Sequence, residues 1–256
     1  MPKRMIDLCC DMGESFGNYK MGKDEEIMKY VSSANVACGF HAGDPMVIAR
    51  TVRLAKANKV AVGAHPGYPD LLGFGRRKIE ISPEEAMNYT IYQIGALRTF
   101  VECEGLRLQH VFLHGALQGV ASKDESIARA IIEGIKKVDP ELIFIYRPGL
   151  ASYEIAKKSG LKVGIVIGVD IDYTSEGIAV IQRKKKDADP KEAARKAVRI
   201  VKEGKMTVVT GEDIEMKADS ILVHGDTPNA IEVLKAIRDE FNKEDIDVVS
   251  LKRVLG

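Results

Sequence analysis

Apolar residues follow two patterns that alternate along this chain from one end to the other. Short, almost continuously apolar runs are typical of buried strands, and segments with an apolar residue every three or four positions are typical of amphipathic helices. We expect strands at 4–10, 33–38, 59–64, 108–113, 142–146, 161–169, 220–223 and 246–251. Because the strands alternate with helices and are apolar on both faces, the pattern predicts a parallel sheet that helices cover.

Capping residues mark where several helices begin. Asp44 followed by Pro45 predicts a helix start, and Ser82 with Glu85 three residues later predicts a capping box. Helices are expected at 24–31, 45–58, 82–105, 123–137, 150–158, 189–204 and 225–241, with a hairpin around Gly211. In the stretch LQHVFLHGALQG, the two glycines favour a tight turn directly after the strand.

These elements form seven or eight strand–helix units with no linker of domain-breaking composition, which predicts one domain over residues 1–256. No glycine-rich dinucleotide fingerprint follows the first strand, and the segment GFGRR is not preceded by a strand. An open doubly wound sheet stays an alternative. We expect instead an α/β fold with a closed or nearly closed, TIM-like (β/α) barrel.

The charge balance argues against several classes of protein. There are 38 Lys and Arg residues and 37 Asp and Glu residues, so the net charge of +1 argues against a general nucleic-acid or membrane role. The basic run Arg183–Lys186 is expected to be a solvated loop. No apolar run reaches the roughly 18 residues of a transmembrane helix. The first residues pass directly into a strand, so no secretory signal is expected.

The four cysteines, Cys9, Cys10, Cys38 and Cys103, form no CxxC pair. We expect reduced, mostly buried thiols in a cytoplasmic protein, and no zinc site built from sulfur ligands. Cys38 is followed three residues later by His41, so a Cys–His nucleophile pair stays an alternative.

Titratable residues stand at the carboxyl ends of the predicted strands. They are Asp11, His41, His65, His114, Asp170 and His224. In a parallel barrel these strand ends meet at one face, where active sites are built, so we expect one functional site there. The remaining histidine, His110, lies within its strand, and we assign it a structural role.

The types of these residues limit the chemistry. Carboxylates beside several imidazoles can polarise a carbonyl and activate water, and they can also bind a divalent metal. The serine nucleophile motif GxSxG is absent. The residues therefore favour hydrolysis or acyl chemistry on a small carbonyl compound, without identifying the substrate.

Six motifs resemble those of one known family. They are DLCCDMGESFG, SANVACGFHAGDP, VGAHPGYPDLLGFGRR, YQIGAL, LQHVFLHGAL and VHGDTP. Their order and spacing over residues 5–250 are similar to the LamB/YcsF family. The resemblance implies a barrel of the glycoside hydrolase/deacetylase type. It also implies ATP-dependent opening of the lactam 5-oxoproline to glutamate, with ATP as cofactor and 5-oxoprolinase subunits B and C as partners. No residue is assigned as a metal ligand, and whether the protein binds a divalent metal stays an open question.

The resemblance further implies roles for particular residues. Asp11 would be the acid or base. The other catalytic residues would be His41, His65, His114 and Asp170. Substrate contacts would come from Glu14, Asn35, Asp44, Arg76, Arg77, Tyr173, His224 and Asp226. Two simpler interpretations stay open, with Asp44 as a helix cap and the two arginines as a pair on a surface loop.

The chain departs from the family's usual sequence at charged positions. Phe112 stands where the family has lysine, Val166 where it has glutamate and Ile171 where it has arginine. A missing charged hydrogen bond is worth about 1.5–3 kcal/mol, so these losses would weaken the binding of an anionic substrate. We interpret the chain as a divergent member and keep two alternatives. These are a stand-alone metal-dependent amidase or deacetylase, and a non-catalytic subunit.

Overall fold

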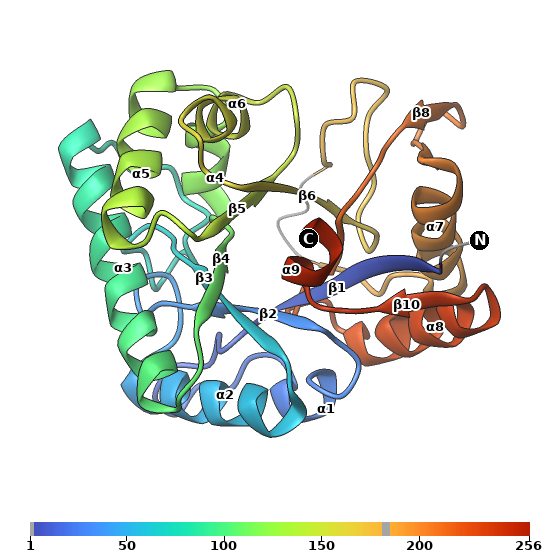
Figure 1. Cartoon of the computed structure of the whole chain (residues 1–256), viewed down its shortest axis with the longest axis horizontal. Helices are drawn as coiled ribbons and strands as arrows, with labels where there is room; N and C mark the ends of the chain where they lie inside the picture. Colours follow the sequence, from blue (N-terminus) through green and yellow to red (C-terminus); the bar gives the residue numbers. More distant parts are fainter. Residues whose placement is uncertain (1–2, 181–184) are drawn as a thin grey trace. The chain divides into compact units, whose positions relative to one another are not determined.

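The computed structural model describes residues 3–180 and 185–256 (Figure 1). Contacts within the chain divide it into two compact units. The first unit consists of Met1–Cys10, Gly22–Ser33 and Ile165–Gly256. The second unit consists of Asp11–Met21 and Ala34–Gly164. The single domain over residues 1–256 stays a prediction.

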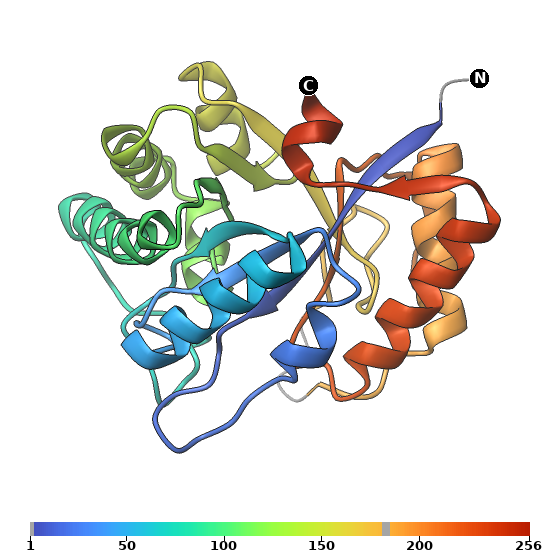
Figure 2. The same cartoon turned by 60° about the horizontal axis from the view of Figure 1, so that its bottom comes forward.

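The second unit is built on parallel strands. In order across the sheet they are β2 (Ser33–Ala37), β3 (Ala61–His65), β4 (Leu108–Val111) and β5 (Ile143–Tyr146). Strand β4 pairs in parallel with both β3 and β5. The helices are α2 (Pro45–Asn58), α3 (Pro83–Cys103), α4 (Gly115–Ala121), α5 (Glu125–Val138) and α6 (Ala151–Lys158). Helices α2, α3 and α5 lie outside these strands (Figures 1 and 2).

The first unit also consists of parallel strands and helices. Its strands are β1 (Arg4–Met12, whose last two residues are counted in the second unit), β6 (Val163–Gly168, whose first two are), β9 (Ser220–Val223) and β10 (Ile246–Val248). Strand β1 pairs in parallel with β10 and β9, and β9 pairs with β6. The helices are α1 (Asp24–Ile27), α7 (Pro190–Glu203), α8 (Ala230–Lys243) and α9 (Leu251–Leu255). The predicted hairpin is formed by antiparallel β7 (Lys205–Thr207) and β8 (Asp213–Glu215).

The parallel strands and their helices confirm the predicted α/β fold of the TIM-like (β/α)-barrel class. The predicted caps are also confirmed, since the side chain of Ser82 accepts from the backbone N–H of Glu85 in a complete capping box. Asp189 caps α7 in the same way, by accepting from the backbone N–H groups of Lys191 and Glu192. Side-chain hydroxyl and carboxylate oxygens satisfy the N–H groups that a helix start leaves without partners.

The tight turn expected in HGALQG is wrong, because the segment forms helix α4, Gly115–Ala121. Gly115 has a φ of +51°, so it bends the chain at the first helical position rather than ending the structure. Leu117 and Ala121, four residues apart, are buried on the same side of this helix. Tertiary burial of that apolar face therefore outweighs the helix-weakening effect of the glycines.

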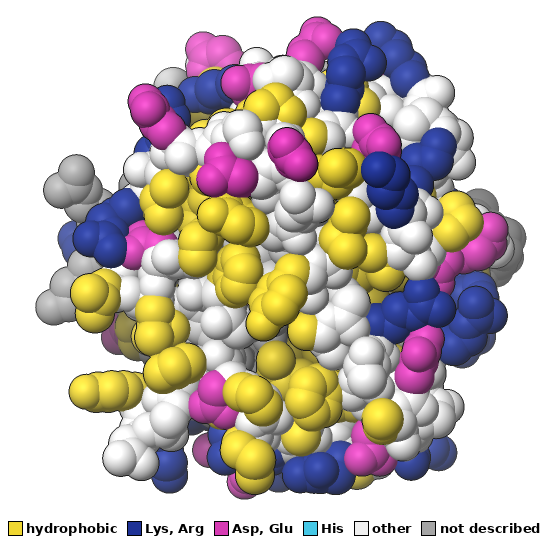
Figure 3. All heavy atoms as spheres, turned by 90° about the vertical axis from the view of Figure 1, so that its left-hand side faces the viewer, with side chains coloured by type: hydrophobic (Ala, Val, Ile, Leu, Met, Phe, Trp, Pro, Cys, Tyr) yellow, Lys and Arg dark blue, Asp and Glu magenta, His cyan; other side chains and the backbone are white. Residues whose placement is uncertain are grey.

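No helix within residues 3–180 and 185–256 is long and apolar enough to cross a membrane. Figure 3 shows the side of the molecule that carries α3 and α5, with hydrophobic side chains gathered over the middle of this face and charged side chains mostly around its edge. Cys9, Cys10 and Cys38 are buried free thiols, as expected, while Cys103 is exposed.

A buried carboxyl group, Asp7 on β1, lies in the core of the first unit and is fully buried. It accepts hydrogen bonds from the hydroxyls of Ser32 (2.7 Å), Ser33 (2.7 Å) and Ser220 (2.6 Å). Burial raises the pKa of Asp7 from 3.8 to about 6, because the ionised form is poorly solvated, and the three hydroxyls only partly offset that effect.

This raised pKa gives the stability a pH dependence with a defined sign. Between pH 4 and 6 the folded protein holds a proton on Asp7 that the unfolded chain has released, so the free energy of unfolding falls as the pH rises. The contribution of this one group is about 3 kcal/mol. We expect Asp7→Asn to remove that pH-dependent component in denaturant titrations, whereas Asp247→Asn, at an exposed position, keeps it. If the free energy of unfolding of wild type and of Asp7→Asn depended on pH in the same way, the raised pKa of Asp7 would be contradicted.

Candidate active site

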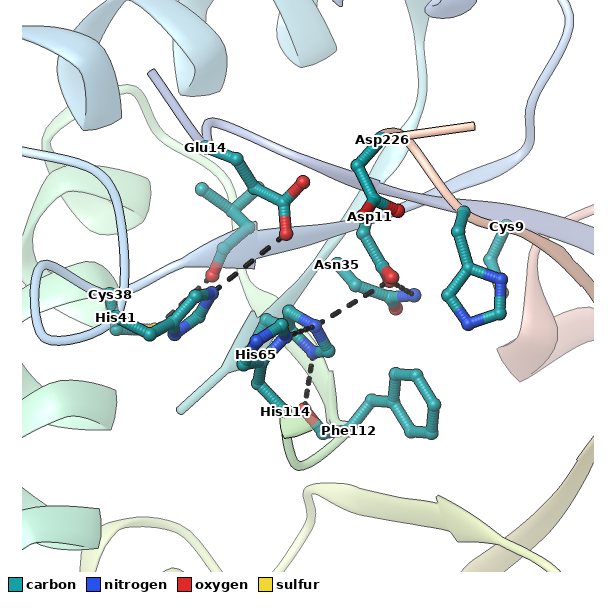
Figure 4. Close-up of polar contacts among 12 residues, drawn as sticks. Cys9, Asp11, Glu14, Asn35, Cys38, His41, His65, Phe112, His114 and Asp226 are labelled. Carbon is teal, nitrogen blue, oxygen red and sulfur yellow. Dashed lines mark hydrogen bonds and ion pairs between the residues drawn. The ribbon is translucent and has the colours of Figure 1, made fainter. Parts of the chain in front are cut away.

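Four buried side chains of the second unit form what we call the histidine cluster (Figure 4). They are Glu14, His41, His65 and His114, and one ligand-type atom from each lies within 4.8 Å of all the others. His65 is the last residue of β3, and His114 follows β4 directly before α4. His41 lies in a turn after β2 that is closed by a hydrogen bond from the Gly39 N–H to the Ala42 carbonyl, 2.9 Å. Strand ends thus bring the cluster together, as the sequence predicted for these histidines.

Backbone carbonyl groups fix the rings of His65 and His114. His65 Nδ1 lies 2.7 Å from the carbonyl oxygen of Phe112, and His114 Nε2 lies 2.8 Å from that of Phe74. The remaining nitrogens of the two rings, His65 Nε2 and His114 Nδ1, are 3.0 Å apart. The ring of Phe112 also stacks on His65, with 5.2 Å between centroids. The strand-end backbone therefore determines which ring nitrogens face the centre of the cluster.

His41 is the most enclosed member of the cluster. Its ring stacks on that of His114, with centroids 3.7 Å apart and planes 4° apart. Neither ring nitrogen has a hydrogen-bond partner among the described residues, and Nε2 is 3.9 Å from Glu14 Oε1. Burial, together with the neighbouring His114, His65 and Arg76, holds the pKa of His41 well below its usual range. His41 is therefore a neutral imidazole at pH 7.

Two glycines make room for the His41 ring. A Cβ at Gly67 would lie 2.6 Å from His41 Nδ1, and a Cβ at Gly75 would lie 2.7 Å from His41 Cβ. Gly75 also has a φ of +62°, which side chains disfavour. The glycines of the turn-rich loop after β3 thus permit close approach to the cluster.

A chain of hydrogen bonds holds Asp11 beside the cluster. Asn35 Nδ2 donates to Asp11 Oδ1 at 2.9 Å, and Asn35 Oδ1 accepts from His110 Nε2 at 2.7 Å. Burial, and then the neighbouring His65, lowers the pKa of His110 to about 3, so His110 is neutral and one ring nitrogen donates. His110 was expected to be structural, and here it orients Asn35 and through it Asp11. Gly63 leaves the space for this ring, since its Cβ would lie 2.1 Å from His110 Nε2.

Asp11 itself is 5% exposed, and its Oδ1 lies 3.7 Å from His65 Nε2. A fixed carboxylate beside an imidazole is an arrangement that can take a proton from water or give one to a leaving group. Cys38 does not share this chemistry, because burial raises the pKa of its thiol to about 12 and its Sγ lies 3.2 Å from the Val36 carbonyl. The Cys–His nucleophile pair is therefore disfavoured.

Asp44, Arg76 and Arg77 were expected to contact substrate, and the structure places them in contacts of other kinds. Asp44 caps α2 by accepting from the backbone N–H groups of Met46 and Val47, and it also accepts from the Gly17 N–H at 2.7 Å. The guanidinium of Arg77 is bound to the Asp70 carboxylate and is 66% exposed at its side chain. Arg76 lies over the Phe74 ring, 5.0 Å from its centroid. Substrate contact by these residues stays a prediction.

A second group of polar residues, which we call the Asp170 cluster, lies in the first unit. The fully buried Asp170 carboxylate contacts His224 Nδ1 at 2.9 Å, Thr227 Oγ1 at 2.5 Å and Lys185 Nζ at 3.3 Å. Lys185 Nζ also lies 3.5 Å from Asp226 Oδ1. Burial alone would raise the pKa of Asp170, but His224, Lys185 and Thr227 together hold it well below its usual range. Asp170 is therefore an ionised carboxylate within a charged network.

Lys185 is the residue of this cluster that the sequence analysis missed. In the run Arg183–Lys186, the first two residues lie outside the described ones, but the Lys185 side chain is only 12% exposed. The interpretation of Lys185 as part of a solvated loop is wrong, because the ionised, buried Asp170 requires a cation nearby. Tyr173, expected at the substrate, has its Oη accepting from the Gly168 N–H at 3.0 Å. This hydrogen bond stabilises the end of β6.

The predicted site residues thus fall into two groups. Asp11, Asn35 and the histidine cluster belong to the second unit, and the Asp170 cluster belongs to the first. Within each group the residues lie close together, whereas Asp44, Arg76, Arg77 and Tyr173 make the other contacts described above. The meeting of both groups at one face stays a prediction.

Comparison with known proteins gives concordant results. The sequence model of the LamB/YcsF family matches residues 6–256. The A subunit of 5-oxoprolinase from Thermococcus onnurineus is 52% identical over 248 residues, covering 96% of this chain and 97% of the relative. That of Pyrococcus abyssi is 49% identical over 254 residues, covering 98% and 99%. The crystal structure of the lactam utilization protein from Thermus thermophilus superposes with a TM-score of 0.89 at 44% identity, covering 96% of this chain and 99% of that one.

Proposed function

The chain belongs to the LamB/YcsF family, and on this premise we propose that it is the A subunit of a 5-oxoprolinase, a hydrolase that opens the lactam of 5-oxoproline to glutamate. The observation that carries the proposal is identity of 52% and 49% to proteins named as the A subunit of 5-oxoprolinase, over nearly the whole of both chains. The Asp11 side chain and the histidine cluster supply the groups that such a reaction needs.

The chemistry of lactam opening assigns a role to each group. Water adds to the carbonyl carbon, the ring C–N bond breaks, and the nitrogen takes up a proton to leave as an amine. Asp11, oriented by Asn35, takes the proton from water and returns one to the nitrogen. The N–H group of His41, the cluster ring whose nitrogens have no hydrogen-bond partner among the described residues, stabilises the negative charge that develops on the carbonyl oxygen. Burial of the cluster strengthens these interactions, since little water competes for them.

The amide in a five-membered lactam resists hydrolysis, and ATP is the proposed cofactor that drives its opening. The proposed partners are subunits B and C, because the relatives are named as subunits of one enzyme. The Asp170 cluster, with Lys185 as its cation, is the proposed contact for an anionic group of substrate or nucleotide. The proposed location is the cytoplasm, which suits four cysteines that are all free.

Reconstitution with the cognate subunits tests the proposal. We expect the chain mixed with subunits B and C to form glutamate from 5-oxoproline, with ADP and phosphate released, only when ATP is present. Omission of any one subunit is expected to abolish the product. Absence of glutamate with partners whose binding has been verified would contradict the proposal and favour a non-catalytic subunit. ATP-independent amide hydrolysis by the chain alone would favour a stand-alone amidase.

A further inference from the structure

The ring nitrogens of His65 and His114 that face each other lack a hydrogen that either could donate to the other. A carbonyl oxygen only accepts, so His65 Nδ1 carries the hydrogen that is donated to Phe112, and His114 Nε2 carries the one donated to Phe74. In a neutral imidazole the other nitrogen then presents a lone pair. His65 Nε2 and His114 Nδ1 therefore point lone pairs at each other across 3.0 Å. Such an arrangement needs a positive charge at its centre, either a proton or a metal ion.

The distances around these nitrogens suit a metal ion. Zinc–nitrogen bonds are about 2.0–2.1 Å, so two nitrogens 3.0 Å apart would subtend an angle of about 90° at one ion. The planes of the two rings are 81° apart, and a small rotation of each ring would turn its lone pair from the facing nitrogen toward an ion beside both. The carbonyl partners of the opposite nitrogens are also what metal-binding histidines usually have, because they fix the ring orientation.

Two further ligand-type side chains reach the same position. Glu14 and His41 are buried, and one ligand-type atom of each lies within 4.8 Å of a ring nitrogen of His65 and of a ring nitrogen of His114. The His41 ring nitrogens have no hydrogen-bond partner among the described residues, although the ring is completely buried. A buried polar atom of this kind costs free energy unless it binds something. The His41 ring lies parallel to that of His114, so it would have to tilt to direct a nitrogen at an ion that the two rings share.

We propose that the histidine cluster is a binding site for one divalent transition-metal ion, held by His65 Nε2, His114 Nδ1, the Glu14 carboxylate and His41. Imidazole and carboxylate ligands together favour Zn²⁺ over the hard cations Mg²⁺ and Ca²⁺, which take oxygen ligands. The proposal stands on the geometry of the second unit and does not depend on the substrate or on the partner subunits.

Metal binding by the isolated full chain tests this proposal directly. The protein is stripped with a chelator, dialysed, and titrated with Zn²⁺ in competition with a chromophoric chelator. We expect one equivalent of Zn²⁺ per chain. Co²⁺ in place of Zn²⁺ is expected to give visible d–d absorption, and X-ray absorption of the Zn²⁺ form is expected to show only nitrogen and oxygen neighbours at about 2.0–2.1 Å. Uptake of less than one equivalent, or a sulfur neighbour at about 2.3 Å, would overturn the proposal.

Variants identify the ligands. His65→Gln, His114→Gln and Glu14→Gln are each expected to weaken Zn²⁺ binding by at least about 10-fold. His224→Gln, which alters the Asp170 cluster in the first unit, is expected to bind Zn²⁺ as the wild type does. Circular dichroism of each metal-free variant tests whether that variant is folded. If a variant does not fold, the X-ray absorption of the wild type still identifies the metal's neighbours. Unchanged Zn²⁺ binding in the first three variants would place the metal outside the histidine cluster and overturn the proposal. A strongly low-field imidazole proton in a wild type that takes up no metal would show that a proton bridges the two rings instead.

Discussion

Asp11→Asn is expected to lower the rate of ATP-dependent glutamate formation by about 1000-fold, within the range that a positioned acid or base contributes. The asparagine oxygen can still accept the 2.9 Å hydrogen bond from Asn35, so the geometry is retained while the proton-accepting group is lost. Because the loss concerns the reaction step rather than substrate binding, kcat is expected to fall with little change in KM.

Steady-state kinetics of the reconstituted enzyme measure this effect. Asp124→Asn is the matched control, since it makes the same carboxylate-to-amide change at the N-cap of α5, where asparagine caps about equally well. We expect the control to keep wild-type kinetics. A loss of less than about 10-fold in Asp11→Asn would remove Asp11 from the role of acid or base.

Asp170→Asn is expected to lower the free energy of unfolding at pH 7 by about 2–3 kcal/mol. Breaking a buried ion pair leaves the remaining charge without its counter-ion, and the partial exposure of Lys185 (12%) and His224 (21%) reduces the cost below that of a fully buried pair. The pKa of Asp170 is lowered in the folded state, so its contribution is complete above the unfolded pKa and is lost as the pH falls. The difference between variant and wild type should therefore shrink in acid.

Thermal and denaturant unfolding measure this change, which corresponds to a fall in Tm of roughly 5–10 °C. Asp172→Asn is the matched control, because its pair with Lys196 involves a carboxylate that is 54% exposed and should cost at most about 1 kcal/mol. In a double-mutant cycle, Lys185→Met is expected to cost much less in the Asp170→Asn background than in wild type. Additive effects would show that the two side chains do not interact.

The sequence pattern predicted the secondary structure well where burial and local signals agree. Strand β9 and helix α3, for example, follow from an apolar run and from the capping box at Ser82. It failed at α4, where two glycines favoured a turn although burial of Leu117 and Ala121 makes a helix. Helix α8 starts at Ala230 rather than near residue 225, because the expected start is taken up by a turn after β9. Local propensity decides such segments only where tertiary packing is neutral.

For the site, too, the sequence predicted some residues and missed others. His41, His65 and His114 could be found from the sequence because each follows an apolar run, and the ends of parallel strands face the same way. Lys185 could not be found, because a basic run is ordinarily solvated and only the buried Asp170 gives this lysine a partner. The bridging role of Asn35 between Asp11 and His110 likewise needed coordinates, since the three residues are far apart along the chain.

By itself, the sequence determined the fold class, the family and the set of residues able to do chemistry, because these depend on periodicity and on residue types at fixed spacings. Only the tertiary structure decided how those residues act together. The carbonyl groups of Phe112 and Phe74 turn the lone pairs of His65 and His114 toward each other, and that orientation depends on backbone positions set by packing. Hydrogen-bond direction is a property of atoms in space, so no pattern along the chain could reveal the metal site that we propose.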